Sequence, residues 1–272
     1  MKSISHIFEN IIDINNIAVT VSEAMRGKKK NESIQKFLHP DNLTTNVFKI
    51  HKGLIDGTLP RQEKREPKII HEPSANKYRI IYPPHNDEHV IHHLVCNELE
   101  SMFMRGMYEF CIASVPRRGG SYGRRYMEKW LRQYGNKRLY VLKLDIHHFF
   151  DSIDRRILFK KLCDRIKDRR FVEVIKKIIW HDGEENDIGI PIGFYSSQWF
   201  ANFFLQDFDH YVKQELHIPH YMRYMDDMVL LCPDKRKLRE AFISIESYLN
   251  NVGLSLNHKH QLFKFSYIDK DG

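Results

Sequence analysis

The sequence has 272 residues, of which 42% are hydrophobic, and its 43 Lys and Arg outnumber 35 Asp and Glu to give a formal net charge of +8. That apolar content suffices for the core of one large domain or two modest ones, and the basic excess favours a protein that neutralises phosphates. Four widely spaced cysteines without a Cys-x-x-Cys pair argue against a disulfide framework and a cysteine zinc site. The sequence shows no signal peptide and no apolar run near ~18 residues, so we expect a cytoplasmic protein without a membrane span.

The hydrophobic pattern predicts alternating helices and strands. Two apolar runs between residues 69 and 84 predict a hairpin with a loose turn, and helical spacing predicts helices over 86–104, 155–180, 197–216 and 235–252. Pro219 and Gly253 follow the last two helices, where such residues end helices. Strand-like runs cover 140–144, 221–231 and 254–265. Strands alternating with helices that cover one face predict an α+β fold.

Asp145 ends the first of these strands. A carboxylate at the end of a strand is held rigidly and can face a cleft, but an Asp at a turn before a helix is more often an N-cap. For Asp151 and Asp154, which follow in the same segment, we expect the N-cap role.

Asp226 and Asp227 lie between two apolar strand segments, with Met225 and Met228 on either side. Adjacent like charges in an apolar hairpin destabilise it unless water or a cation neutralises them. A tight turn prefers Asn-Gly or Asp-Gly, so Met-Asp-Asp-Met is poor turn chemistry. A local rule broken inside a consistent segment indicates a functional site.

Three carboxylates that converge from two strands are suited to hard cations such as Mg²⁺. Two ions about 3.5–4 Å apart can activate a 3′-hydroxyl and stabilise a leaving pyrophosphate. We therefore predict a two-Mg²⁺ site, with Mn²⁺ as the alternative ion, held by Asp145, Asp226, Asp227 and the backbone carbonyl of Ile146.

Several segments resemble, in order and spacing, the motifs of reverse transcriptases. Tyr224-Met225-Asp226-Asp227 matches the YxDD box, and residues 144–150 match the first metal-binding motif. Residues 189–198 lie between them, and residues 77–84 and 114–120 resemble the fingers motifs of the family. The resemblance covers roughly residues 70–265 and implies an RNA-directed DNA polymerase with right-hand fingers and palm.

The resemblance also implies which residues contact the incoming nucleotide. Phe150 matches the aromatic gate that excludes a 2′-hydroxyl; its alternative is a core position beside Phe149, and in an extended stretch the two rings would face opposite sides. Arg79 and Lys77 resemble the residues that clamp the triphosphate, or else are solvated charges on an exposed hairpin. Lys259 takes the place of a lysine that could protonate pyrophosphate. The flanking His258 and His260 could instead form a metal pair, but an i,i+2 pair without a third ligand nearby in sequence is more typical of a solvated strand face.

Residues 192–198 indicate a subtype. Most of the superfamily has Gln before the glycine and Ser-Pro a few residues later, whereas this chain has Ile192-Gly193 and Ser197-Gln198. That pattern resembles the error-prone reverse transcriptases of diversity-generating retroelements in bacteria and phages. Ile192 lacks the hydrogen-bonding amide of glutamine, so selection of the nucleotide is expected to be looser. One departure is Phe194, where these enzymes often have Asn.

The resemblance further implies a domain order and partners. We expect an N-terminal helical extension over 1–68, fingers over 69–135 and a palm over 136–272, with the thumb absent or truncated. The expected partners are template RNA, a DNA primer or the growing cDNA, deoxynucleoside triphosphates and a small basic accessory protein, in a bacterial or phage-infected cell.

Other functions share these motifs or this fold. Anti-phage defence, retron-like and group II intron reverse transcriptases would carry the same three acids. Retron-like and group II intron enzymes, however, usually have the Gln-Gly and Ser-Pro forms. A polymerase-like RNA-binding scaffold without activity is the non-enzyme alternative, which the presence of all three acids disfavours.

Overall fold

The computed structural model describes residues 6–28, 30–59, 66–72, 77–180 and 186–266. The chain forms two compact units that interleave along the sequence. Unit 1 comprises Met1–Met104 and Asp154–Phe200, and unit 2 comprises Arg105–Ile153 and Ala201–Gly272. The predicted division into extension, fingers and palm remains a prediction, because these units are defined by internal contacts and not by function.

Unit 1 is mainly helical. It contains four N-terminal helices, a two-stranded hairpin, most of a long helix and a helix pair: α1 (Phe8–Ile12), α2 (Ile14–Ala24), α3 (Glu32–Leu38), α4 (Pro40–Ile55), β1 (Lys68–Glu72), β2 (Lys77–Ile81), α5 (Asn86–Gly106), α8 (Arg155–Cys163) and α9 (Arg169–Ile179). Their apolar faces are fully buried at Ile11, Ile17, Val21 and Ile50. The predicted hairpin and the helix over 86–104 are confirmed.

The predicted helix over 155–180 is in fact two helices. Asp154 caps α8 by accepting hydrogen bonds from the N–H groups of Arg156 and Ile157, as predicted. Asp168 caps α9 and also accepts the N–H groups of Ile7 and Phe8, 2.9 Å away. Asp168 therefore begins α9 and also ties the N-terminal segment to it. The expected cap role of Asp151 is wrong, since this residue lies inside α7 (Phe149–Ser152), after His148.

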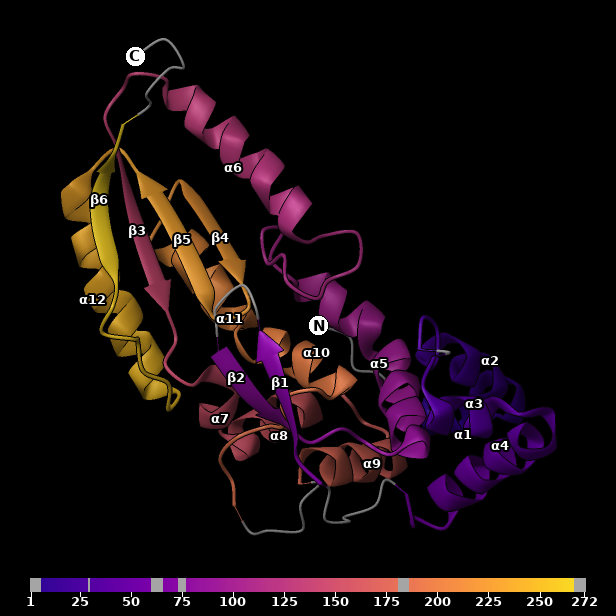
Figure 1. Ribbon diagram of the computed structural model, residues 1–272. Helices are drawn as coiled ribbons and strands as arrows, with labels where there is room; N and C mark the ends of the chain where they lie inside the picture. The colour runs from indigo at the N-terminus through magenta and orange to yellow at the C-terminus, as the bar shows by residue number, and fades with distance from the viewer. Residues whose placement is uncertain (1–5, 29, 60–65, 73–76, 181–185, 267–272) are drawn as a thin grey trace. The chain divides into compact units, whose positions relative to one another are not determined.

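Unit 2 is built on an antiparallel sheet of four strands in the order β4-β5-β3-β6. The strands are β3 (Leu139–Asp145), β4 (His220–Tyr224), β5 (Asp227–Cys232) and β6 (Gln261–Phe265), and the helices are α6 (Gly120–Tyr134), α7, α11 (Gln206–His210), a π-helix (Tyr211–Glu215) and α12 (Lys235–Asn251). α10 (Tyr195–Phe204) runs from unit 1 into unit 2. Figure 1 shows this sheet with α12 along it and α6 on another side.

Sheet alternation assigns these helices to opposite faces. Leu139 and Val141 of β3 share a core with Trp130 of α6. Alternate residues point the other way, and there Lys235 of α12 lies 5.8 Å from the ring of Tyr140. The expected α+β architecture, an antiparallel sheet backed by helices, is confirmed.

Two boundaries differ from the sequence prediction. The helix expected over 197–216 is divided into α10, α11 and the π-helix, and the last strand begins only at Gln261. The helix expected over 235–252 is confirmed, with Gly253 at φ +78° just after it. No helix in the described part of the chain is long and apolar enough to cross a membrane.

Candidate active site on the four-stranded sheet

Asp145 and Asp227 are cross-strand partners at one end of the sheet, since β3 and β5 pair in antiparallel register from Tyr140 opposite Cys232 to Asp145 opposite Asp227. Directly opposed residues point to the same face, about 4.5–5.5 Å apart at Cβ. By alternation this is the face that α6 covers at Leu139. At the Asp145 end the face is open, because Asp227 and Lys143 are exposed.

The turn between β4 and β5 brings the third acid to this end. Tyr224 pairs with Asp227, so that Met225 and Asp226 alone form the turn. Met225 has φ +58° and is buried. A left-handed conformation costs a residue with a side chain roughly 1–2 kcal/mol, and glycine would avoid that cost. The poor turn chemistry noted in the sequence is thus a real strain beside Asp226.

A buried arginine supports this strained turn. The guanidinium of Arg223 donates from Nη1 to the carbonyl oxygen of Met225 at 2.9 Å and to Asn202 Oδ1 at 3.1 Å. It also forms a bidentate pair with Asp209 at 2.8 and 2.6 Å, and both side chains have 0% exposure. This set was not predicted from the sequence, although an arginine inside an apolar strand indicates a buried acid partner.

The electrostatics of the acidic pair indicate mutual repulsion. Although solvent reaches the Asp227 side chain, partial desolvation by the atoms around it and, next, the Asp145 charge raise the pKa of Asp227, and Lys143 opposes them. Asn257 holds Asp145 from the other side: its Nδ2 donates to Asp145 Oδ2 at 3.0 Å, and its backbone N–H donates to the Asp145 carbonyl at 2.7 Å. The pair is therefore oriented and carries excess negative charge, which a divalent cation would relieve.

The fit to metal ions rests on this pair. In the described ranges no group of three or more His, Cys, Asp or Glu side chains lies together as a site that could hold a metal ion. Asp145 and Asp227 nevertheless offer oxygen ligands on an open face, and Asp226 lies in the adjoining turn. Ile146, whose carbonyl was predicted as a further ligand, is buried and bridges to Leu256 as the chain leaves the sheet.

Two further predicted residues lie in unit 2. Phe150 is half-buried in α7, with its ring centroid 5.6 Å from that of the buried Phe149. The opposite facing of the two rings was expected only for an extended stretch, and this segment is instead a helical turn. Lys259 is exposed and lies before β6, where its N–H donates to Asn257 Oδ1 at 3.2 Å, so it belongs to a turn and not to a strand.

The remaining predicted nucleotide contacts lie in unit 1. Gln198 is exposed on α10, Ile192 is half-buried and Gly193 has φ +107°. Lys77 and Arg79 belong to β2, and their side chains lie outside the described part of the structure. The predicted set is thus divided between the two units. Unit 2 contains the three acids, Ile146, Phe150 and Lys259, and unit 1 contains the other predicted residues.

Phe194, the departure from the expected pattern, has a structural role. Its ring packs edge-on against His92 at 4.7 Å, and the next residue, Tyr195, stacks on His93 at 3.8 Å. Burial first, then the charges of His89 and Lys28, lowers the pKa of His93 to about 3. These pairs hold the segment after Gly193 against α5.

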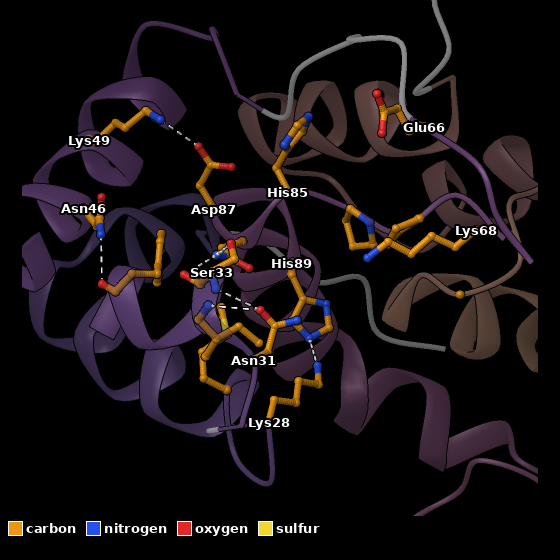
Figure 2. Close-up of a pocket in the computed structure, with 17 residues that line it drawn as sticks. Lys28, Asn31, Ser33, Asn46, Lys49, Glu66, Lys68, His85, Asp87 and His89 are labelled. Carbon is orange, nitrogen blue, oxygen red and sulfur yellow. Dashed lines mark hydrogen bonds and ion pairs between the residues drawn. The ribbon is translucent and has the colours of Figure 1, made fainter. Parts of the chain in front are cut away.

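Unit 1 also contains a cavity of about 790 Å³ that Gly193 borders (Figure 2). Many of its polar groups bind one another: Lys49 pairs with Asp87 at 3.0 Å, and Lys28 Nζ contacts His89 Nε2. Burial and the Lys28 charge lower the pKa of His89 to about 4. Several polar side chains that line the cavity are therefore already paired with one another.

The solved structures similar to this chain include two telomerases. Apo telomerase from Candida tropicalis, truncated from its C-terminal domain, superposes with a TM-score of 0.52 at 14% identity, over 76% of this chain and 51% of that chain. Telomerase from Candida albicans with a fragment of telomeric RNA gives 0.51 at 15% identity, over 86% and 47%. At such identities the likeness establishes the fold alone. The chain spans about half the length of these structures.

Comparison of the sequence with known proteins identifies the family. The retron Ec73 reverse transcriptase of Escherichia coli is 32% identical over 108 residues, a match that covers 35% of this chain and 33% of that protein. The family model described as reverse transcriptase (RNA-dependent DNA polymerase) matches residues 64–268. That match includes the paired strands of Asp145 and Asp227 and the Met225 turn, and it spans most of the chain. The chain therefore belongs to the reverse transcriptase family.

Proposed function

We propose that this chain catalyses RNA-directed DNA synthesis, with Asp145, Asp226 and Asp227 as its metal-binding carboxylates. The observation that carries the proposal is the opposed pair Asp145 and Asp227 on an open sheet face, directly beside a strained turn that presents Asp226. Acids so close together are unfavourable without a cation, and the family to which the chain belongs is one of polymerases.

We assign a different role in this reaction to each of these residues. Two Mg²⁺ ions held by the three carboxylates would supply charge stabilisation for the attacking 3′-oxygen and the leaving pyrophosphate. Asn257 fixes the carboxylate of Asp145 through its amide. Arg223 fixes the Met225 carbonyl and hence the turn. We assign the role of gate for the sugar to Phe150, which is half-buried in α7 of the same unit.

A single-acid variant tests the proposal. Asp226→Asn should abolish primer extension on an RNA template and leave RNA binding, because phosphate contacts come from Lys and Arg elsewhere. Asp151→Asn is the matched control, since Asp151 is an exposed acid only six residues from Asp145. Full extension by Asp226→Asn would refute the assignment, and equal loss of extension and binding would show that the variant is misfolded. Replacing Mg²⁺ with Mn²⁺ in the same assay identifies the preferred ion.

We further propose that the enzyme is of the diversity-generating type, which copies a template RNA with errors at adenines and works with a small basic accessory protein. The support is Ile192-Gly193 together with Ser197-Gln198, where an amide is missing that could bind the incoming nucleotide. Ile192→Gln should then lower misincorporation opposite template adenines, measured by sequencing the cDNA. Equal error rates at all four template bases in the unsubstituted chain would refute this subtype.

The second candidate is a retron-like reverse transcriptase, favoured by the 32% identity to the Escherichia coli enzyme over 108 residues. The sequencing experiment separates the two, because uniform low error is expected for the retron-like function. Both candidates require the same three acids.

A further inference from the structure

The basic charge of this chain is concentrated in one segment. Residues 117–138 contain eight Lys and Arg and one Glu, whereas the rest of the chain has 35 Lys and Arg against 34 Asp and Glu. The excess that gives the protein its net charge of +8 therefore lies almost entirely in α6 and its flanking turns. A charge distributed for solubility alone would not be gathered in this way.

One side of α6 is buried in unit 2 and the other carries the cations. Gly123 and Trp130 pack against the sheet, with Met127 and Leu131 beside them. The outer side and the turn after it form what we call the α6 basic face: Arg124, Arg125, Lys129, Arg132, Lys137 and Arg138, all of them exposed. Figure 1 shows α6 as one long helix of unit 2.

Aromatic rings hold part of the α6 basic face in place. The guanidinium of Arg125 lies 5.5 Å from the ring of Tyr122 and 5.3 Å from that of Tyr126, and Lys129 Nζ lies 5.9 Å from Tyr126. Such contacts order the side chain without cancelling its charge. The arrangement of ordered cations between rings is typical of surfaces that bind nucleic acid.

The single acid in the segment neutralises little of this charge. Glu128 accepts from Arg124 Nε at 2.8 Å and lies 3.8 Å from Arg132 Nη2. A shallow groove of about 480 Å³ runs between Arg125, Lys129 and Arg132, with Glu128 and Gln133 completing its walls. Like charges at i,i+4, such as Arg125 and Lys129, destabilise a helix, and an anionic partner would relieve that repulsion.

The position of α6 within unit 2 suggests which nucleic acid it would meet. α6 covers the same sheet face that carries Asp145, over the start of β3 at Leu139. Asp145 lies six positions after Leu139 along β3, about 20 Å by the rise of a strand. A backbone bound by Lys129 and Arg132 is thus outside the reacting centre and still on its side of the sheet.

We infer that the α6 basic face binds the sugar–phosphate backbone of the template RNA outside the stretch being copied. The inference rests on the proposed function, which makes RNA the template. An α-helix cannot enter the deep, narrow major groove of A-form RNA, so the contacts are to phosphates and carry no sequence preference. The face anchors the RNA while the copied stretch moves through the active site.

The test compares two triple variants of the full chain. Arg125→Gln/Lys129→Gln/Arg132→Gln removes three charges from the α6 basic face. Lys235→Gln/Arg236→Gln/Arg239→Gln is the matched control on α12, where one cation also lies near a ring, Tyr140, and another, Arg236, also pairs with a glutamate at i,i+4. Circular dichroism establishes that both variants are folded.

Binding of a long RNA is measured by fluorescence anisotropy over a range of salt concentrations. We expect the slope of log affinity against log salt to fall by about 2 in the α6 variant, since each lost phosphate contact removes roughly 0.7–0.9, and affinity near 0.1 M salt to fall at least about tenfold. The control should keep the slope of the unsubstituted chain. Extension of a short primer–template at saturating concentration should stay within about twofold in both.

An unchanged slope in the α6 variant would overturn the inference and assign the face to solvent or to an acidic protein. An equal loss in both variants would overturn it too, because any three cations would then serve. Absence of extension by the unsubstituted chain would count against the proposed function alone, because the salt slopes are measured without synthesis.

Discussion

The buried pair of Arg223 and Asp209 predicts that the catalytic turn depends on a side chain that touches no substrate. Arg223 donates to Asp209 through two hydrogen bonds and to Met225 and Asn202 through one each, and Tyr221 Oη donates to Asp209 Oδ1 at 2.8 Å. Burial opposes the charge of Arg223, but the Asp209 carboxylate outweighs it and the net pKa of Arg223 is raised. The arginine is therefore charged in the folded protein.

Asp209→Asn breaks this pair and leaves Arg223 charged and buried without compensation. Removing one partner of a buried ion pair costs about 3–5 kcal/mol, a large share of the 5–15 kcal/mol that typically stabilises a protein. Urea unfolding followed by circular dichroism should show a loss of that size. Asp207→Asn is a neighbouring acid on the same helix, α11, and is the control.

A second variant separates stability from geometry. Asp209→Leu/Arg223→Met/Tyr221→Phe replaces the polar cluster by apolar side chains of similar size, and such replacements are often neutral in stability. It also removes the donor to the Met225 carbonyl. Leaving a buried acceptor without a donor costs about 1–3 kcal/mol. Because this cost destabilises the turn that contains Asp226, we expect the rate of primer extension to fall about tenfold or more. We also expect a higher Mg²⁺ concentration to be needed for the half-maximal rate.

The refuting result is clear for each variant. Stability within 1 kcal/mol of the unsubstituted chain for Asp209→Asn would mean that the pair is not an energetic unit. Unchanged extension and Mg²⁺ dependence in the apolar triple variant would mean that Arg223 stabilises the fold without positioning the turn.

Three further predictions follow from other parts of the structure. Gly123→Ala should destabilise the protein by about 1–3 kcal/mol, because its Cβ would lie 2.3 Å from Ile112 Cδ1, whereas Gly120→Ala, which meets nothing within 4 Å, should not; equal unfolding curves would refute the close approach of α6 to the sheet. His93 is harder to protonate in the folded chain, where its pKa is about 3, than in the unfolded chain, so its contribution to stability is present above about pH 6.5 and is lost as the pH falls toward 3. His93→Phe should flatten that fall in urea titrations, and an unchanged profile would mean that another group causes it. Arg79→Ala should raise the nucleotide concentration needed for extension by one to two orders of magnitude, about 1–3 kcal/mol, with Lys68→Ala on the partner strand as control; an unchanged requirement would place the triphosphate clamp elsewhere.

The sequence by itself determined the family motifs and most elements. Asp145 was singled out by its place at the end of a strand and by the resemblance to the first metal-binding motif. Asp226 and Asp227 were singled out by their turn chemistry, a local property that a few neighbouring residues decide. The helices over 86–104 and 235–252 followed in the same way. Poor turn chemistry at Met225 also pointed to the site before its φ of +58° was known.

Only the tertiary structure decided what supports and surrounds that site. Arg223 and Asp209 are 14 residues apart, and Asn202 is 21 residues from Arg223, so no local pattern joins them. Asp168 at the start of α9 also binds the N–H groups of Ile7 and Phe8, some 160 residues away. Both cases have one physical reason: a buried polar group must find a partner, and which segments become neighbours is settled only when the chain has folded.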